Sequence, residues 1–214
     1  MTYSVKEIYF TLQGEGAQTG RPAVFLRFSG CNLWSGREAH REQAICRFCD
    51  TEFVGTDGPG GGKFETAESL ADAVRRAWPD ASMHGKPYVV CTGGEPLLQL
   101  DRAALDALHA AGFEVGVESN GTLKAPDGID WLCISPKGKA PVIQTTGNEL
   151  KLVYPQAEVE AQPDAFTDMC FEHFFLQPLD SAERDANTRS AINYCLGHPQ
   201  WKLSLQTHKI LGID

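Results

Sequence analysis

Three cysteines in the first quarter of the chain have the residue type and spacing of a metal or iron–sulfur site. Cys31, Cys46 and Cys49 follow the pattern Cys-x14-Cys-x2-Cys, and a CxxC turn brings two thiolates onto one metal or cluster. No obvious fourth cysteine accompanies them, so one iron of a 4Fe–4S cluster would have no protein ligand. Such an open position is what substrate chemistry at a metal requires. The alternative is a structural zinc site with His40, inside the long spacer, as the fourth ligand.

The remaining four of the seven cysteines are scattered along the chain. An odd number of cysteines, in a chain with no visible leader segment, favours a metal or catalytic cluster over a framework of disulfides. The scattered residues have apolar neighbours, which predicts that they are buried small side chains. They are Cys91, Cys133, Cys170 and Cys195.

Composition and charge narrow the class of protein. The chain has 214 residues, 42% of them hydrophobic, and a formal net charge of −9. This length fits one domain over residues 1–214, and the negative charge argues against a nucleic-acid partner, which requires a basic surface. No apolar run is long enough to span a membrane, and no basic segment with an apolar run opens the chain. We therefore expect a cytoplasmic protein.

Strand and helix signals alternate along the chain and must position these residues. Thr66 is a candidate N-cap for one helix, and Asp101 is a candidate N-cap for a second helix that ends near Gly112. A third helix is predicted over 181–196. Strands are predicted over 23–28, 88–91, 113–117, 129–134, 150–153, 173–176 and 201–206.

Alternating strands and helices predict a parallel sheet with functional residues at the carboxyl ends of its strands. Only eleven residues separate Val117 from Ile129, which is too few for a crossover helix, and residues 135–148 have the composition of a loop. We therefore expect an α/β fold, an abridged TIM-like β/α barrel that lacks some crossover helices. Residues 55–63, with five glycines, are predicted to form a flexible loop. The spacer 32–45 is predicted to be a solvated insertion in the cluster loop.

Two segments together resemble the radical S-adenosylmethionine superfamily. Cys46-Arg47-Phe48-Cys49 follows Cys31, and Thr92-Gly93-Gly94-Glu95-Pro96 follows the next predicted strand. The usual motif of the superfamily is Cys-x3-Cys-x2-Cys, so this chain carries eleven additional residues (14 − 3) between its first two cysteines. The resemblance implies that the cluster and the cofactor carry the radical chemistry, with no protein residue as the catalyst.

Further segments narrow the resemblance to the 7-carboxy-7-deazaguanine synthase family and cover the chain from end to end. They are Thr11-Leu12-Gln13-Gly14-Glu15-Gly16, Arg27, Gly30-Cys31-Asn32-Leu33, Cys49-Asp50-Thr51, Ser135-Pro136-Lys137, Gln177-Pro178-Leu179-Asp180 and Gln206-Thr207-His208-Lys209.

The family resemblance implies a lyase of queuosine and deazapurine biosynthesis. Its substrate would be 6-carboxy-5,6,7,8-tetrahydropterin, contracted to 7-carboxy-7-deazaguanine with loss of ammonia. The implied cofactors are a 4Fe–4S cluster, S-adenosylmethionine and Mg²⁺, and the implied partners are an external electron donor such as a flavodoxin and a second copy of the chain. Two alternatives stay open, an enzyme that generates a glycyl radical on a partner protein and a non-catalytic zinc or cluster module.

The same resemblance implies roles for individual residues. Cluster ligands would be Cys31, Cys46 and Cys49, and Thr51 would bind Mg²⁺. Residues expected to contact S-adenosylmethionine are Phe48, Cys49, Asp50, Gly94, Glu95, Ser135, Pro136, Lys137, Gln177, Pro178, Leu179 and Asp180. Residues expected to contact the pterin are Leu12, Gln13, Gly14, Arg27, Thr92 and Asp214.

The position of Arg27 predicts a binding role independently of the resemblance. A charge in the middle of an apolar strand needs a partner. Its guanidinium can bind a carboxylate with two hydrogen bonds, and the implied substrate carries a carboxylate. The alternative is that Arg27 lies on an edge strand and reaches water.

Overall fold

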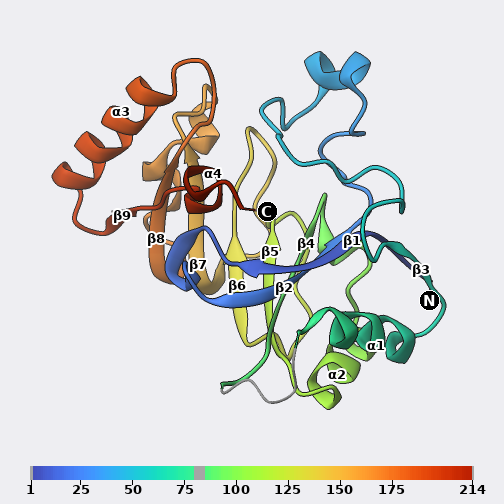
Figure 1. The fold of residues 1–214 in the computed structure, drawn as a ribbon. Helices are drawn as coiled ribbons and strands as arrows, with labels where there is room; N and C mark the ends of the chain where they lie inside the picture. The colour runs from blue at the N-terminus through green and yellow to red at the C-terminus, as the bar shows by residue number, and fades with distance from the viewer. Residues whose placement is uncertain (1, 80–84, 214) are drawn as a thin grey trace.

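A single mixed sheet forms the frame of the molecule. The computed structural model describes residues 2–79 and 85–213. Nine strands pair in the order β3-β1-β2-β4-β5-β6-β7-β8-β9 (Figure 1). Their bounds are β1 Tyr3–Leu12, β2 Pro22–Phe28, β3 Gly62–Phe64, β4 Tyr88–Gly93, β5 Glu114–Ser119, β6 Trp131–Ile134, β7 Thr146–Tyr154, β8 Cys170–Pro178 and β9 Trp201–Leu203.

In the order of the sheet, each strand from β2 to β9 pairs parallel with the next. β1 pairs antiparallel with both of its neighbours, β2 and β3. The order begins at β3 and ends at β9, so the barrel is open. Parallel pairing brings the carboxyl ends of β2, β4, β5, β6, β7 and β8 to one edge of the sheet, where functional residues gather in folds of this kind.

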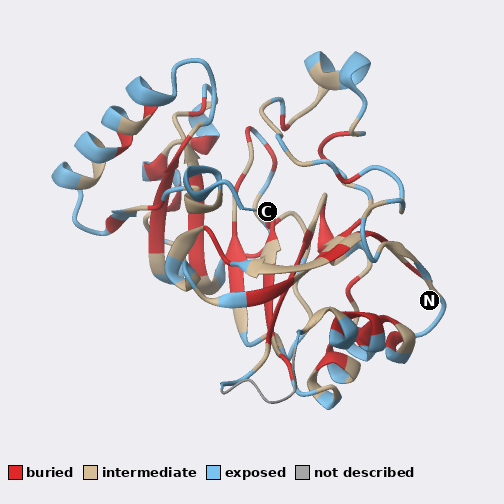
Figure 2. Cartoon of the chain, in the orientation of Figure 1, coloured by how far each residue is buried: buried red, intermediate tan, exposed pale blue. Residues whose placement is uncertain are grey.

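Helices cover the outer face at the two ends of the sheet. α1 (Ala67–Ala77) and α2 (Arg102–Ala110) pack together over the β1–β5 side, around a core that includes Leu26, Leu70 and Leu105. α3 (Arg184–Gly197) packs over β8 and β9 around a second core. In Figure 2 the buried faces of these helices turn toward the sheet.

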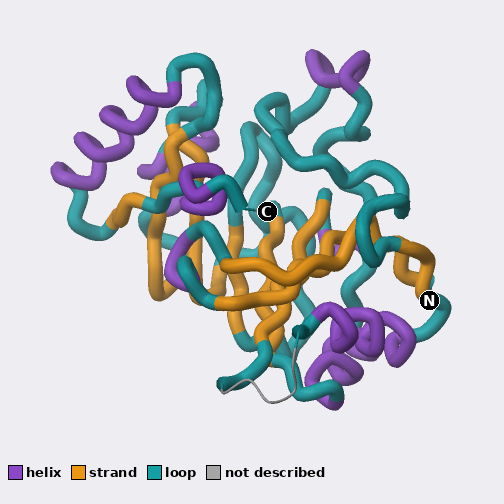
Figure 3. Tube along the Cα trace, viewed as in Figure 1, coloured by secondary structure: helices purple, strands orange, loops and turns teal. Residues whose placement is uncertain are grey.

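The middle of the sheet lacks crossover helices. Between β5 and β8 the described chain contains no α-helix, only 3-10 turns at Val159–Ala161 and Pro163–Phe166. Figure 3 shows long loops in place of helices in this region. The prediction of an abridged β/α barrel is therefore confirmed.

Most predicted elements are present, and both predicted N-caps are confirmed. The Thr66 side chain accepts a hydrogen bond from the backbone N–H of Ser69, and the Asp101 side chain accepts one from that of Ala104. The prediction missed β1, and it missed α4 (Thr207–Leu211). β1 was missed because its central residues do not alternate regularly, and its register shifts between Val5 and Glu7.

The glycine-rich segment 55–63 is more ordered than predicted. Its end forms β3, and the Ile8 N–H donates to the carbonyl of Pro59 over 2.7 Å. The segment therefore extends the sheet beyond β1, and its interpretation as a flexible loop is wrong for Gly62 and Lys63.

The scattered cysteines follow the prediction in part. Cys91 and Cys133 are buried on strands, but Cys170 is exposed at the start of β8 and Cys195 is half-buried on α3.

No helix in the described ranges is both long and apolar enough to cross a membrane.

Asp101 connects two elements, so its removal is expected to cost more than the loss of an ordinary cap. Its carboxylate also accepts a hydrogen bond of 2.7 Å from the hydroxyl of Tyr3, a residue that is 2% exposed. Asp101→Ala should lower the free energy of unfolding by roughly 2–4 kcal/mol, combining a lost cap with an unsatisfied buried hydroxyl. Thr66→Ala is the control and should cost about 1 kcal/mol. Equal losses in urea unfolding would contradict the role of the Tyr3 contact.

Candidate active site

A cavity of about 430 Å³ opens at the carboxyl ends of the parallel strands. This volume suits a small-molecule site. Residues at or just after the ends of β4, β5, β6 and β8 line it, and Arg27 of β2 faces it. The cysteine loop contributes the wall on one side, and the C-terminal segment that includes Gln206 and Lys209 contributes another.

The three cysteines gather at this cavity. Cys31, Cys46 and Cys49 all line it, and they pack in one small cluster with Leu33 and Ala140. Interaction between the Cys46 and Cys49 side chains lowers the pKa of Cys49 to about 6 and raises the pKa of Cys46. Burial raises the pKa of Cys31.

The arrangement does not fit a structural zinc site. His40 is exposed, and its Nδ1 lies 2.9 Å from the Ser35 hydroxyl oxygen. Over residues 2–79 and 85–213 no group of three His, Cys, Asp or Glu side chains is close enough to hold a single metal ion. Cys31, Cys46 and Cys49 instead gather at the cavity wall, where a 4Fe–4S cluster held by these three would present its open iron to the cavity.

The turn after β4 lies directly against the cysteine loop. The Glu95 N–H donates to the carbonyl of Gly30 over 2.9 Å, and a Cβ on Gly94 would lie 2.2 Å from the same carbonyl oxygen. Only glycine permits this approach. The turn and the loop that carries Cys31 are therefore fixed against each other.

Glu95 does not line the cavity but lies behind it. It is fully buried, and its carboxylate accepts hydrogen bonds of 2.8 Å from the Ser119 hydroxyl and the Asn120 N–H. Burial raises its pKa, although these hydrogen bonds oppose the shift. The structure thus gives Glu95 the geometry of a support for the ends of β4 and β5.

The other sequence-predicted site residues come together with few exceptions. Pro136, like Glu95, is not among the lining residues, and Asp214 lies outside the described residues. The predicted residues that line the cavity are Leu12, Gln13, Gly14, Arg27, Cys31, Cys46, Phe48, Cys49, Asp50, Thr51, Thr92, Gly94, Ser135, Lys137, Gln177, Pro178, Leu179 and Asp180.

Arg27 has partners within the protein. Its Nε lies 2.7 Å from Glu7 Oε1, and its Nη2 donates to the Tyr9 hydroxyl oxygen over 2.8 Å. β2 lies between β1 and β4, so the alternative of an edge-strand arginine is wrong. Glu7 and Tyr9 hold the guanidinium at the cavity wall.

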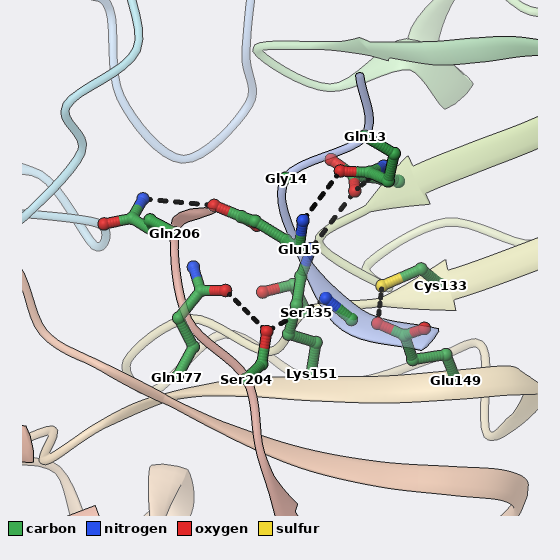
Figure 4. Close-up of polar contacts among 12 residues, drawn as sticks. Gln13, Gly14, Glu15, Cys133, Ser135, Glu149, Lys151, Gln177, Ser204 and Gln206 are labelled. Atoms are coloured by element: carbon green, nitrogen blue, oxygen red, sulfur yellow. Dashed lines mark hydrogen bonds and ion pairs between the residues drawn. The ribbon is translucent and has the colours of Figure 1, made fainter. Parts of the chain in front are cut away.

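A buried group of charges at the cavity floor was missed from the sequence. The Lys151 side chain is 5% exposed, and its Nζ lies 2.6 Å from Glu15 Oε2 and 3.1 Å from Glu118 Oε1 (Figure 4). Burial opposes both charged forms, yet the ion pairs raise the pKa of Lys151 and lower that of Glu15. Lys151 lies in a strand between Leu150 and Leu152, and the argument used for Arg27 would have identified it.

Below this group, buried polar residues connect the strands. Glu149 accepts a hydrogen bond of 3.0 Å from the Ala17 N–H and one of 3.5 Å from the Cys133 thiol, and burial raises its pKa (Figure 4). The Ser204 hydroxyl donates to Gln177 Oε1 over 3.1 Å. These contacts join the first loop, the central strands and the C-terminal segment.

The C-terminal helix α4 closes one side of the cavity mouth. The carbonyl of Gly14 accepts hydrogen bonds from the N–H and the hydroxyl of Thr207. Lys209 Nζ lies 2.6 Å from Asp50 Oδ2 and 2.7 Å from Asp180 Oδ2, so it bridges the cysteine loop and the end of β8. A Cβ on Gly14 would lie 2.3 Å from His208 Nδ1.

Comparison with known proteins places this geometry in a family. No family model matches the chain. A 7-carboxy-7-deazaguanine synthase from Caulobacter vibrioides and one from Bordetella pertussis are each 63% identical to it over the full length of both chains. A third from Nitratidesulfovibrio vulgaris is 54% identical over the same extent. The crystal structure of QueE from Escherichia coli superposes with a TM-score of 0.71 at 27% identity, covering 96% of this chain and 94% of that one.

An open β/α barrel with a three-cysteine loop over a cavity at its strand ends defines a radical S-adenosylmethionine enzyme, which binds a 4Fe–4S cluster and S-adenosylmethionine. The full-length relatives narrow the class. The chain belongs to the 7-carboxy-7-deazaguanine synthase family.

Removing the buried ammonium group should make stability rise between pH 7 and pH 5, a range in which the Glu15–Lys151 pair contributes no pH dependence to the wild type. In the wild type, the lowered pKa of Glu15 contributes stability above its ordinary value of 4.5, and this contribution is lost as pH falls below that value. Lys151→Met leaves Glu15 and Glu118 without their counter-charge, which should cost roughly 3–5 kcal/mol at pH 7. Protonation then relieves the variant, so its stability should rise from pH 7 to pH 5.

Thermal unfolding at both pH values measures this effect. Lys124→Met, at an exposed position, is the control and should leave the wild-type response unchanged. A Lys151→Met protein whose stability does not rise relative to that of the wild type between pH 7 and pH 5 would contradict the charge assignment.

Proposed function

We propose that this chain converts 6-carboxy-5,6,7,8-tetrahydropterin into 7-carboxy-7-deazaguanine, with release of ammonia, in deazapurine biosynthesis. The observation that carries the proposal is a single cavity with the three cysteines on one wall and Arg27, Glu118 and Lys151 on the others. A small polar substrate bearing a carboxylate matches a cavity of this size and charge. Family membership over the whole chain supports the same reaction.

The cysteine side of the cavity is proposed to hold the cofactors. Cys31, Cys46 and Cys49 would hold the 4Fe–4S cluster. When bound, the cluster supplies the reductive cleavage of S-adenosylmethionine that begins radical chemistry on the substrate. The residues proposed to contact S-adenosylmethionine that line the cavity are Phe48, Cys49, Asp50, Gly94, Ser135, Lys137, Gln177, Pro178, Leu179 and Asp180. The contacts of Glu95 and Pro136, which are not among the lining residues, stay predictions.

The opposite side is proposed to bind the pterin. Arg27 would bind the substrate carboxylate with the part of its guanidinium that Glu7 and Tyr9 leave available, because those two contacts fix its orientation. Leu12, Gln13, Gly14 and Thr92 would contact the ring. The contact of Asp214 stays a prediction.

Mg²⁺ and the partners complete the proposal. Thr51 lines the cavity two residues after Cys49, and a small hard cation suits one hydroxyl together with substrate oxygens and water. We also infer a homodimer and an external electron donor such as a flavodoxin, and no nucleic-acid or membrane partner. A cytoplasmic location follows from the need to keep the thiols reduced.

An anaerobic assay tests the proposed reaction. Reconstituted protein given the carboxypterin, S-adenosylmethionine and a reductant should form 7-carboxy-7-deazaguanine. Cys31→Ala should lose both the visible absorbance of the cluster and the activity, because one of three ligands is gone. Cys170→Ser, an exposed position on β8, is the matched control and should retain both. The proposal is wrong if wild-type protein with a full cluster yields no product, or if Cys31→Ala retains its cluster.

Magnesium titrations test the role of Thr51. Thr51→Ala should lower turnover several-fold and reduce the benefit of added Mg²⁺ at unchanged iron content, because the ligand oxygen is lost. Thr51→Ser keeps that oxygen and should retain most of the activity. Superimposable magnesium curves for wild type and Thr51→Ala would exclude Thr51 as a ligand.

A further inference from the structure

The insertion in the cysteine loop folds back onto the loop that it interrupts. Its 3-10 helix (Glu38–Gln43) stands at the top of Figure 1, with most of its residues exposed. One side chain from it, Arg41, points back to the CxxC turn. Arg41 Nη1 donates hydrogen bonds to the carbonyl of Arg47 over 2.8 Å and to that of Cys49 over 3.0 Å.

The guanidinium of Arg41 is fixed on its other sides as well. Its Cζ lies 4.1 Å from the ring centroid of Trp34, and its Nε lies 2.8 Å from Glu38 Oε1. Trp34 is 8% exposed and packs edge-on against Phe53, with ring centroids 5.7 Å apart. The Arg41 side chain is 29% exposed. A buried aromatic ring therefore anchors a cation beside the turn that carries Cys46 and Cys49.

We propose that Arg41 is a positioning residue for the iron–sulfur cluster, holding the Cys46–Cys49 turn in its ligating shape and raising the reduction potential of the cluster. The carboxylate of Glu38 partly cancels the charge of Arg41 and so limits the rise in the reduction potential. The inference rests on the proposed ligation by Cys31, Cys46 and Cys49, and gives the insertion a function.

The chemistry of the residue types explains the choice of arginine. A guanidinium stays charged at any working pH and presents several donors in one plane, so it can bind two carbonyls, a carboxylate and an aromatic face together. A nearby positive charge favours the reduced, more negative state of a cluster, and surrounding charge and hydrogen bonds set such potentials. Outer contacts of this kind orient the ligands themselves.

The first experiment measures the cluster potential by a redox titration followed by electron paramagnetic resonance, without S-adenosylmethionine. Arg41→Gln should shift the potential to more negative values. Glu38→Gln should shift it to more positive values, because it removes the counter-ion. Arg37→Gln removes a charge from the same insertion at an exposed position and should cause a smaller shift than Arg41→Gln. A merely structural role would not give shifts of opposite sign.

The second experiment uses the protein before reconstitution, so it does not depend on cluster loading. The backbone amide of Ile45, which precedes the turn and donates to the Leu33 carbonyl over 3.1 Å, should exchange with solvent several-fold faster in Arg41→Gln than in wild type, and Arg37→Gln should match wild type. Arg41→Lys keeps the charge but loses the planar set of donors. Its Ile45 amide should therefore exchange faster than in wild type. Its cluster potential should lie closer to the wild-type value than the potential of Arg41→Gln does.

Two results would overturn the inference. One is an unchanged potential in Arg41→Gln at equal iron content, and the other is unchanged exchange of the Ile45 amide. If Arg41→Gln loads no cluster, the exchange measurement alone decides. Failure of wild-type protein to bind a cluster would instead refute the proposed function, so the two failures are distinguishable.

Discussion

The buried ammonium group of Lys151 holds together parts of the molecule that backbone pairing leaves apart. The sheet begins at β3 and ends at β9 without closing. Across the interior, Lys151 on β7 binds Glu118 on β5 and Glu15 in the loop after β1, and Glu15 in turn accepts a hydrogen bond from Gln206. Side-chain charges thus join the first loop, the middle strands and the C-terminal segment, where a full barrel would use strand pairing. Each partner is stable in this buried position only because the others are present.

The same constraint explains why the cavity stays open and polar. The inner faces of β2, β5 and β7 carry Arg27, Glu118 and Lys151, which cannot pack together as aliphatic side chains do. Glu7 and Tyr9 satisfy Arg27, and the two glutamates satisfy Lys151. The strands therefore build a charged floor, while the cysteine loop and the loops after β4, β6 and β8 build the remaining walls. A site for a cofactor and a carboxylated substrate follows from this division between strands and loops.

The sequence predicts the frame because it depends on local patterns, whereas most residues of the cavity wall are predicted through the resemblance to a known family. The caps at Thr66 and Asp101, the missing crossover helices and the cysteine spacing can all be identified from neighbouring residues. Lys151 could have been identified by its apolar neighbours, as Arg27 was, but its partners Glu15 and Glu118 could not, because they lie far away in the chain. The prediction that residues 32–45 are solvated is correct for most of them. It gave no indication of the contacts of Arg41, because the carbonyl partners of this residue are set by the fold and not by a sequence pattern.

The contact between Gly14 and the C-terminal helix restricts the residue type at position 14. A Cβ at position 14 would lie 2.3 Å from His208 Nδ1, and the Gly14 carbonyl holds the first residue of the same helix. The same Cβ would lie 2.9 Å from the backbone nitrogen of residue 208, so a smaller side chain at position 208 would remove only part of the clash. Relatives that keep this helix in this place are therefore expected to keep glycine at position 14, whatever residue stands at position 208.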